Sequence, residues 1–221
     1  LNAEAPEAYA EMHPADAATM LGDLPAKRRI EVARGMEDAR LADVMEEMGD
    51  ATRIEVLNGL DPERAADLLE LMDPDDAADL LADLAPERAE ALLDLVEPDD
   101  AEDLRRLLVY EDATAGGLMN PEPIILPPDA TVAAALASIR NPDLAPSLAA
   151  QVYVVRSPLE TPTGRFLGVA HFQRLLREPP SMLVTSVLDK SITPIGPQAP
   201  LSEVTRSFAT YNLVAIPVVD E

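Results

Sequence analysis

The sequence has 221 residues, a formal net charge of −24 and no cysteine. This length suffices for one or two domains with buried cores, and the absence of cysteine excludes disulfides, zinc–thiolate centres and thiol catalysis. So large an acidic excess excludes a nucleic-acid-binding surface, because carboxylates repel phosphates, whereas cations and basic surfaces are favoured partners.

The negative charge is concentrated in the first half of the chain. Residues 1–112 contain 32 acidic and 10 basic side chains, whereas residues 113–221 contain 9 and 7. This asymmetry predicts two parts with different roles. The sequence has no run of about 18 apolar residues, so we expect no segment that spans a membrane.

A repeat of 11 to 13 residues fills the acidic part. Its clearest copies are residues 61–72, 73–84, 85–96 and 97–108. Each copy has a cap residue, a proline, polar residues and then Ala and Leu at helical spacing. The proline ends one helix and begins the next. Because helices of about 8–10 residues are marginal alone, the repeat predicts a superhelical, solenoid-like bundle.

The copy that begins at Asp73 carries the acidic face of greatest interest. The Asp73 carboxylate is expected to cap the helix, and Pro74 suits the first helical position. Asp75 and Asp79 are four residues apart and therefore share one helical face. Two neighbouring carboxylates on one face are either a solvated surface or half of a site for a hard divalent cation.

After Tyr110 the repeat stops, and the Gly116–Gly117 pair predicts a hinge. Short strands and helices then alternate. Strands are expected at 124–126, 152–155, 166–170, 192–195 and 215–219, and helices at 132–140, 172–176 and about 201–210. The order strand, helix, strand, strand, helix occurs once in full and then begins again. The second copy lacks its last strand and helix, which predicts a truncated copy.

These boundaries predict four segments: an acidic helical domain at residues 1–112, a hinge at 113–120, one α/β copy at 121–181 and a truncated copy at 182–221. The fold class is therefore multidomain, α followed by α/β.

The two α/β copies resemble a CBS-domain pair. The matching stretches are 132–140, 152–155 with 167–169, and 201–211 with 216–220. With the acidic helical repeat before them and the join at 110–119, the whole arrangement from about His13 to Glu221 resembles the cytosolic region of MgtE-type magnesium transporters. The resemblance implies an acidic N domain followed by a CBS pair whose second member is incomplete.

In that family the cytosolic region senses Mg²⁺, which holds the N domain and the CBS domains in a closed arrangement. Carried over by position, the resemblance implies that Asp43, Asp75 and Asp79 are metal ligands and that Gly117 contributes a backbone carbonyl. It further implies a regulatory module at the cytoplasmic face of a membrane, a homodimer formed through the CBS domains and a pore domain outside this chain.

The sequence departs from the family in two places. Where transporter members carry acids on the second CBS helix, this chain has Pro200, Ser202 and Asn212. Glu203 is the acid that remains there. In the adenine-nucleotide pattern Gly-x-x-(Ser/Thr)-x-x-Asp, His171 and Arg174 occupy the last two specified positions, so we expect weak or no nucleotide binding by the first copy. With these departures, the chain resembles soluble actinobacterial relatives that lack a pore.

Three functions therefore stay open. The favoured one is an Mg²⁺-responsive regulatory module. The second is a stand-alone CBS adaptor that binds an adenine nucleotide or a protein partner, and the third is a helical scaffold without a ligand. His13 and His171 are the only histidines, with His13 at an expected N-cap, and no nucleophile motif accompanies them, so no enzymatic activity is expected.

Overall fold

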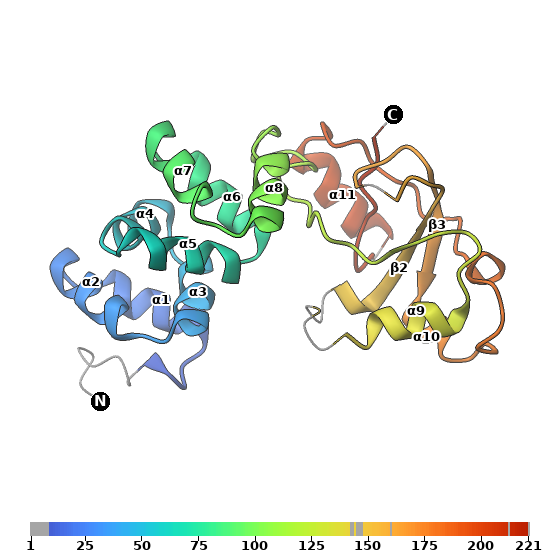
Figure 1. Cartoon of the computed structure of the whole chain (residues 1–221), viewed down its shortest axis with the longest axis horizontal. Helices are drawn as coiled ribbons and strands as arrows, with labels where there is room; N and C mark the ends of the chain where they lie inside the picture. The colour runs from blue at the N-terminus through green and yellow to red at the C-terminus, as the bar shows by residue number, and fades with distance from the viewer. Residues whose placement is uncertain (1–8, 142–143, 145–147, 160, 212, 221) are drawn as a thin grey trace. The chain divides into compact units, whose positions relative to one another are not determined.

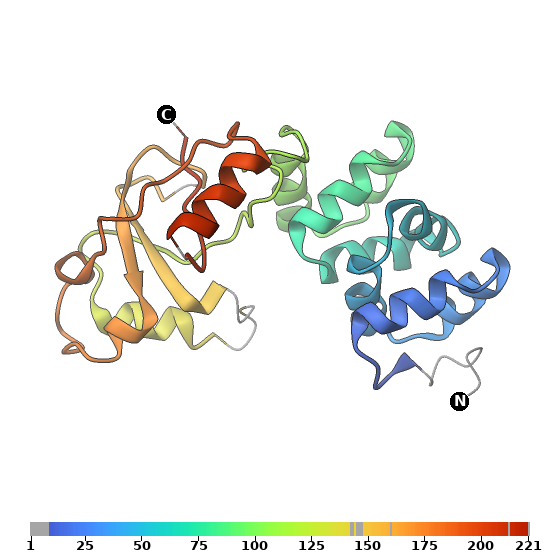
Figure 2. The ribbon, with the colours of Figure 1, turned by 180° about the vertical axis from the view of Figure 1, so that it is seen from behind.

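In the computed structural model, the described residues are 9–141, 144, 148–159, 161–211 and 213–220. The chain separates into two compact units, Leu1–Val109 and Tyr110–Glu221. Figure 1 and the reverse view in Figure 2 show that the first unit is helical and the second combines a small sheet with helices. The four-segment division expected from the sequence stays a prediction.

The N-terminal unit is a stack of short helices, as the repeat predicts. Its helices are α1 (Pro14–Gly22), α2 (Ala26–Gly35), α3 (Asp38–Glu46), α4 (Asp50–Asn58), α5 (Pro62–Leu71), α6 (Pro74–Ala82), α7 (Pro86–Leu93) and α8 (Pro98–Leu107). Each helix from α1 to α6 packs on the helix two places further along. This pairing is the stacking expected of a solenoid, in which short helices bury their apolar faces on their neighbours.

Helix starts in this unit follow the local sequence. Proline lies in the first turn of α1, α5, α6, α7 and α8. His13 caps α1 as predicted, with its Nδ1 accepting a hydrogen bond from the Ala15 N–H at 3.4 Å. The expectation for Asp73 was wrong in one respect. It is the N-cap residue of α6, but its carboxylate accepts no capping hydrogen bond.

The core of the unit is built from the repeat's leucines and alanines. Leu41, Leu57, Leu68, Leu80 and Leu92 are fully buried. Burying such a side chain stabilises the fold by about 1.5–3 kcal/mol. The Leu positions that recur at helical spacing are therefore the ones that hold neighbouring helices together.

A buried arginine closes the end of the first helix. The Arg29 guanidinium donates hydrogen bonds to the backbone carbonyls of Leu21, Gly22 and Leu24 at 2.9–3.0 Å. It also forms an ion pair with Glu55 at 2.5 Å. The last carbonyls of a helix have no partner within the helix, so Arg29 satisfies them while linking three helices of the stack.

The C-terminal unit contains a three-stranded sheet in the order β1-β2-β3. Its elements are β1 (Ile125–Leu126), α9 (Val132–Ile139), β2 (Gln151–Val155), β3 (Phe166–His171), α10 (Phe172–Leu175) and α11 (Leu201–Tyr211). Strand β1 pairs parallel to β2, and β2 pairs antiparallel to β3. These elements match the expected ones to within one or two residues.

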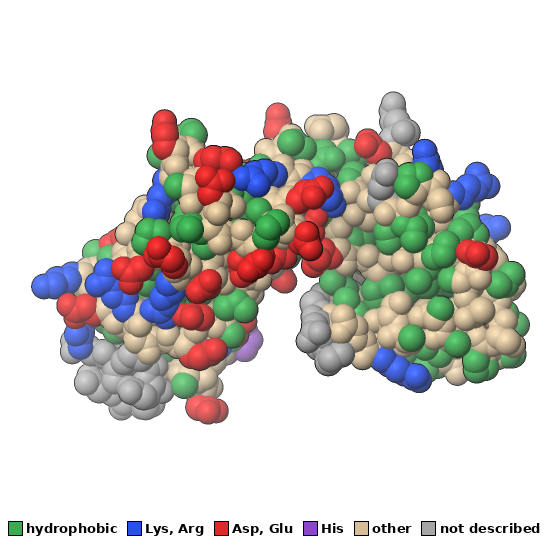
Figure 3. Space-filling model, in the orientation of Figure 1, with side chains coloured by type: hydrophobic (Ala, Val, Ile, Leu, Met, Phe, Trp, Pro, Cys, Tyr) green, Lys and Arg blue, Asp and Glu red, His purple; other side chains and the backbone are tan. Residues whose placement is uncertain are grey.

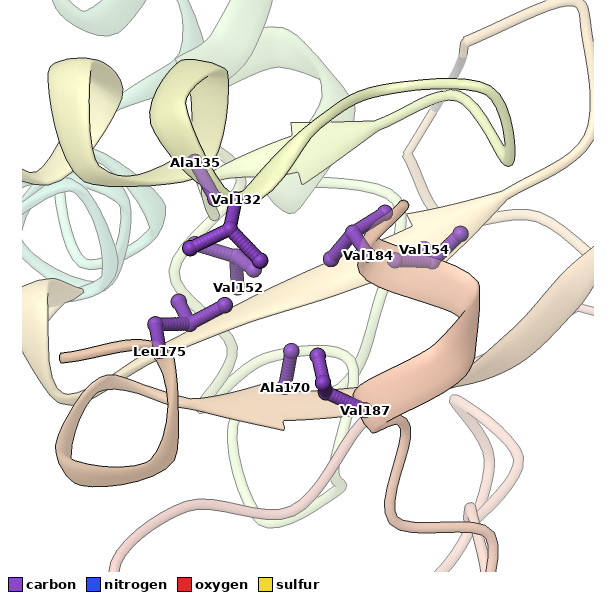
Figure 4. Close-up of a cluster of buried hydrophobic side chains, with 8 residues drawn as sticks. All are labelled: Val132, Ala135, Val152, Val154, Ala170, Leu175, Val184 and Val187. Carbon is purple, nitrogen blue, oxygen red and sulfur yellow. The ribbon is translucent and has the colours of Figure 1, made fainter. Parts of the chain in front are cut away.

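One face of the sheet is covered by α9 and α10. Val152 and Val154 of β2 pack with Val132 of α9, Leu175 of α10 and Val187, all of them buried (Figure 4). Because side chains alternate along a strand, Gln151, Tyr153 and Val155 point to the opposite face. The sheet therefore lies between the core under α9 and α10 and the side chains on its opposite face.

The second α/β copy is less regular than expected. In place of strands at 192–195 and 215–219, the described residues form one parallel bridge between Ile195 and Val218. The Ile195 N–H donates to the Pro217 carbonyl at 3.0 Å, and the Val219 N–H donates to the Ile195 carbonyl at 2.9 Å. In this register the next bonds would be donated by residues 217 and 197, and both are prolines without an N–H, so the ladder cannot extend in either direction.

Among the described residues, none of the helices combines the length and the apolar character that crossing a lipid bilayer requires.

Candidate functional site

Three carboxyl side chains of α3 and α6 lie together in the N-terminal unit. Glu46 is the last residue of α3, Asp73 is the N-cap residue of α6, and Asp76 lies in the first turn of α6. One oxygen from each of the three lies within 4.8 Å of the other two. We refer to Glu46, Asp73 and Asp76 as the acidic cluster. Like charges this close oppose one another's ionisation.

Within the acidic cluster, Glu46 has the most strongly raised pKa. Its Oε1 accepts a hydrogen bond from the Asp73 backbone N–H at 2.7 Å. Burial, followed by the nearby Asp73, Asp76 and Asp43 carboxylates, raises the pKa of Glu46 to about 7, although the Asp73 N–H acts in the opposite direction. The Glu46 carboxyl is thus the group that caps α6, in place of the Asp73 side chain.

Arg53 of α4 supplies positive charge to the acidic cluster. Its Nη1 lies 3.0 Å from Asp76 Oδ1 and its Nη2 lies 3.3 Å from Asp50 Oδ1. Arg53 is 5% exposed, and its Nε has no hydrogen-bond partner. Burial raises the pKa of Asp76 and the Arg53 guanidinium opposes that rise. One fixed arginine therefore accompanies three clustered carboxyl groups.

The aspartates predicted as metal ligands flank the acidic cluster. Asp43 lies one turn before Glu46 on α3, is 60% exposed, and pairs with Arg40 at 3.8 Å. Asp75 and Asp79 are half-buried on α6. Burial, and next the Asp76 carboxylate, raises the pKa of Asp75 to about 6. The two predicted α6 positions are on one helix as expected, and their role as ligands stays a prediction.

Asp75 differs from the acids at the same position of other repeats. The residue after the helix-opening proline is Glu63 in α5, Glu87 in α7 and Asp99 in α8, and all three are exposed. Asp75 is half-buried. The repeat alone would make these four acids equivalent, so it is burial that distinguishes Asp75 from the other three.

Gly117 belongs to the C-terminal unit, whereas the three aspartates belong to the N-terminal unit. It is buried, and its N–H donates to Thr114 Oγ1 at 3.3 Å. A Cβ added at Gly117 would lie 2.6 Å from the Glu111 carbonyl oxygen. Glycine is therefore required for close backbone packing at the predicted hinge, and its role as a carbonyl ligand stays a prediction.

Nothing in the repeat pattern distinguishes Glu46 or Asp76 from the other acidic residues. Glu46 and Asp73 are 27 residues apart, and the same spacing occurs where Glu70 Oε1 accepts from the Glu97 N–H at 2.7 Å. A glutamate in the last turn of one helix thus caps the helix three places further along. The signal was present in the sequence as two equivalent glutamates, but only the stack shows which helix each one reaches.

The donor set of this region suits a hard divalent cation. Every candidate side chain offers carboxylate oxygen, the ligand type that Mg²⁺ and Ca²⁺ prefer. The half-buried carboxyl groups of Glu46, Asp75 and Asp76 have raised pKa values, so their charge is only partly compensated within the protein. Added positive charge would favour their ionised forms.

The positions that depart from the family lie mostly on the surface of the C-terminal unit. Pro200, just before α11, and Ser202 and Glu203 in its first turn are exposed. Arg174 of α10 is exposed as well, and His171 Nε2 lies 3.3 Å from Asp189 Oδ2. Asn212 lies outside the described residues.

The C-terminal unit also contains a cavity of about 240 Å³. Its walls come from the free face of the sheet, the segment before β1, the second-copy residues around Ile195 and the inner side of α11. Most of the lining side chains are apolar. A concave apolar pocket with a few polar groups is the usual form of a small-molecule site.

The N-terminal unit matches a known family model. The family model of the MgtE intracellular N domain matches residues 12–113. A curated relative, the magnesium transporter MgtE of Thermus thermophilus, is 30% identical over 112 residues. That alignment covers 51% of this chain and 24% of the relative, so the match spans about a quarter of the relative's length.

Solved structures extend the similarity to both units. The cytosolic domain of the Mg²⁺ channel MgtE in complex with ATP is 29% identical, with a TM-score of 0.87 over 98% of this chain and 86% of that one. The soluble part of a magnesium transporter is 26% identical, with a TM-score of 0.81 over 97% and 82%. The cystathionine beta-synthase pair domain of a Shewanella oneidensis MR-1 protein shares the fold, with a TM-score of 0.52 and 16% identity over 70% and 86%. The expected fold, a helical domain followed by a unit with the fold of a CBS pair, is confirmed.

Proposed function

We propose that the chain is a non-catalytic, Mg²⁺-responsive regulatory module of magnesium transport. This proposal is supported by the match of residues 12–113 to the family model of the MgtE intracellular N domain, and by the fold that both units share with a solved MgtE cytosolic domain. The module acts at the cytoplasmic face of a membrane. Its effector is the divalent cation, and the pore that it regulates lies outside this chain.

The observation that carries this proposal is the burial of carboxyl groups at the start of α6. Asp75 and Glu46 have pKa values raised to about 6 and about 7, because burial and neighbouring carboxylates disfavour their charge. A ligand that binds one arrangement of a protein better than another shifts the population toward it. A divalent cation that removes carboxylate repulsion has that differential affinity.

The ligand set in this proposal is Asp43, Asp75 and Asp79 of the N-terminal unit, with the Gly117 carbonyl of the C-terminal unit. The acidic cluster lies beside the three aspartates and adds negative potential. Mg²⁺ keeps several waters and needs only a few carboxylates from facing surfaces. We also propose that the chain forms a homodimer through its CBS pair, which light scattering of the purified chain tests.

Calorimetric titration with Mg²⁺ tests the ligand assignment. Asp75→Asn and Asp79→Asn together keep the side-chain shapes and remove two charges, so Mg²⁺ affinity is expected to fall on the order of tenfold or more. The matched control is Glu63→Gln with Asp67→Asn, the equivalent and exposed pair on α5, which should leave the affinity unchanged. Equal losses in both double variants, or no binding heat at millimolar Mg²⁺, would contradict the proposal.

A second candidate function is adenine-nucleotide binding by the CBS pair, as a stand-alone adaptor or alongside Mg²⁺. Two observations favour it: the apolar cavity in the C-terminal unit, and ATP in the related MgtE cytosolic domain. A ligand that binds only the folded state raises the melting temperature. Thermal unfolding with and without adenine nucleotides therefore tests this function.

A further inference from the structure

The stretch that follows α8 folds back on itself before the sheet begins. We refer to residues 110–118 as the joining segment. The Thr114 Oγ1 donates to the Glu111 carbonyl at 2.7 Å and accepts from the Gly117 N–H at 3.3 Å. The Leu118 N–H donates to the Thr114 carbonyl at 3.1 Å. Thr114 is buried, so these bonds form a closed turn around its side chain.

The two glycines of the joining segment serve close packing. A Cβ added at Gly116 would lie 2.5 Å from Cγ of the Tyr110 ring, and one added at Gly117 would lie 2.6 Å from the Glu111 carbonyl oxygen. Neither glycine has a φ in the left-handed region. A hinge residue must have room to change its φ and ψ. The glycine pair, expected to be a hinge, is instead the most tightly packed part of the joining segment.

Backbone hydrogen bonds hold the joining segment to the residues in front of α11. Three N–H groups donate across this contact: Ala115 to the Ala199 carbonyl at 2.8 Å, Gly116 to the Pro197 carbonyl at 2.8 Å, and Leu201 to the Ala113 carbonyl at 2.9 Å. The first and the last of these bonds flank an antiparallel bridge between Thr114 and Pro200. Residues 113–116 therefore act as a short strand paired with the second α/β copy.

This pairing also supports the start of α11. Leu201 is the first residue of α11, and the first N–H groups of a helix have no partner within the helix. The Ala113 carbonyl accepts the hydrogen bond from the Leu201 N–H. Moving the joining segment away would leave that N–H without its partner, so α11 and the joining segment are expected to stay together.

The chain is held less firmly just before the joining segment. The Leu108 N–H donates to the Leu104 carbonyl at 3.0 Å and ends α8. Val109 follows and is 73% exposed, and the division between the two compact units falls directly after it. An exposed residue between two packed elements can change its φ and ψ without displacing neighbouring side chains.

We propose that the joining segment is a rigid part of the C-terminal unit, and that bending between the two units occurs at Val109 and not at Gly116 and Gly117. The rigidity is argued from the contacts within the C-terminal unit alone. The use of Val109 as the pivot for a change of arrangement rests on the proposed response to Mg²⁺.

Hydrogen exchange of the full chain, measured in EDTA and in MgCl₂, tests the rigidity. The amides of Ala115, Gly116 and Leu201 are expected to exchange on the order of a hundredfold or more slower than the Val109 amide in both buffers. Exchange of these three amides as fast as that of Val109, in either buffer, would overturn the inference.

The same measurement separates this inference from the proposed function. If Mg²⁺ changes exchange nowhere and the joining segment stays protected, the response to Mg²⁺ fails and the rigid segment stands. If removal of Mg²⁺ exposes the Ala115 and Gly116 amides, the response stands and this inference fails, because the joining segment itself then opens.

Two insertion variants then locate the pivot. A Gly-Gly insertion directly after Val109 is expected to leave the urea midpoint of the C-terminal unit, followed by exchange of β2 and β3 amides, within about 0.3 M. The same insertion between Gly116 and Gly117 separates Gly117 from Thr114 and should lower that midpoint by roughly 1 M or more. Equal effects of the two insertions would contradict a pivot at Val109.

Discussion

At the scale of single residues, Glu46 combines a structural role with a charge that the fold disfavours. It caps α6 through the Asp73 N–H while lying among other carboxylates. Its pKa is raised from the ordinary value of 4.5 to about 7, which means that the folded state holds this proton more tightly than the unfolded state does. Stability is therefore lost as pH rises from about 4.5 to about 7.

Replacing Glu46 by Gln should remove that pH dependence. Gln keeps a carbonyl oxygen for the Asp73 N–H and carries no charge. At pH 8 we expect stabilisation on the order of 1 kcal/mol after allowance for solvent screening, or about 2–4 °C in Tm; at pH 5 we expect little change. Thermal unfolding at the two pH values measures it. The matched control is Glu70→Gln, which occupies the equivalent capping position for α8. The same gain in the control would contradict this account of Glu46.

The buried Arg53 guanidinium neutralises part of the negative charge of the acidic cluster. Arg53→Met keeps the volume of the side chain but leaves the half-buried Asp76 carboxyl without its partner at 3.0 Å. Breaking a fully buried pair in this way costs about 3–5 kcal/mol, and because solvent reaches the Asp76 carboxyl we expect a smaller loss here, on the order of 1–2 kcal/mol. Urea unfolding should show this loss, and a second change, Asp76→Asn, should restore part of it. An unchanged midpoint for Arg53→Met would mean that the ion pair does not hold the cluster together.

At the scale of elements, the helices were predictable and their contacts were not. The start points at Pro62, Pro74, Pro86 and Pro98 follow from the fixed φ of proline and its missing N–H, so local sequence determines them. The acidic cluster depends on α3 reaching α6 across 27 residues, a property of the stack. A single bridge between Ile195 and Val218 likewise takes the place of two expected strands. The prolines in these segments have no backbone N–H to donate, and the hydropathy pattern that predicted the strands does not take this into account.

Gly168 of β3 is the clearest element-level requirement in the C-terminal unit. Its φ is +151°, and a Cβ there would lie 2.9 Å from the Asp189 carbonyl oxygen. Asp189 pairs with Val169 in an antiparallel bridge along the edge of β3. Gly168→Ala should therefore destabilise this unit by about 1–3 kcal/mol, measured by chemical denaturation. Gly196→Ala is the control, because nothing lies within 4 Å of its added Cβ, and a cost of equal size there would refute the steric argument.

At the scale of the whole molecule, the two units differ in their charge. Acidic side chains are prominent over the N-terminal helices, whereas the visible face of the C-terminal unit is mainly apolar and neutral (Figure 3). The order of the units was predictable because the helical repeat ends at Tyr110 and the strand pattern begins soon after it. The cavity was not, since its lining residues lie in several short segments spread from Ala115 to Val219.

The central claim, that the chain changes its arrangement in response to Mg²⁺, is tested most directly by small-angle X-ray scattering of the full chain. Profiles are compared in EDTA, in about 10 mM MgCl₂ and in KCl of the same ionic strength, which controls for general screening of the acidic surface. We predict a smaller radius of gyration in MgCl₂ than in either other buffer, and loss of that difference in the Asp75→Asn/Asp79→Asn variant. The same radius of gyration in MgCl₂ and in KCl would contradict the claim.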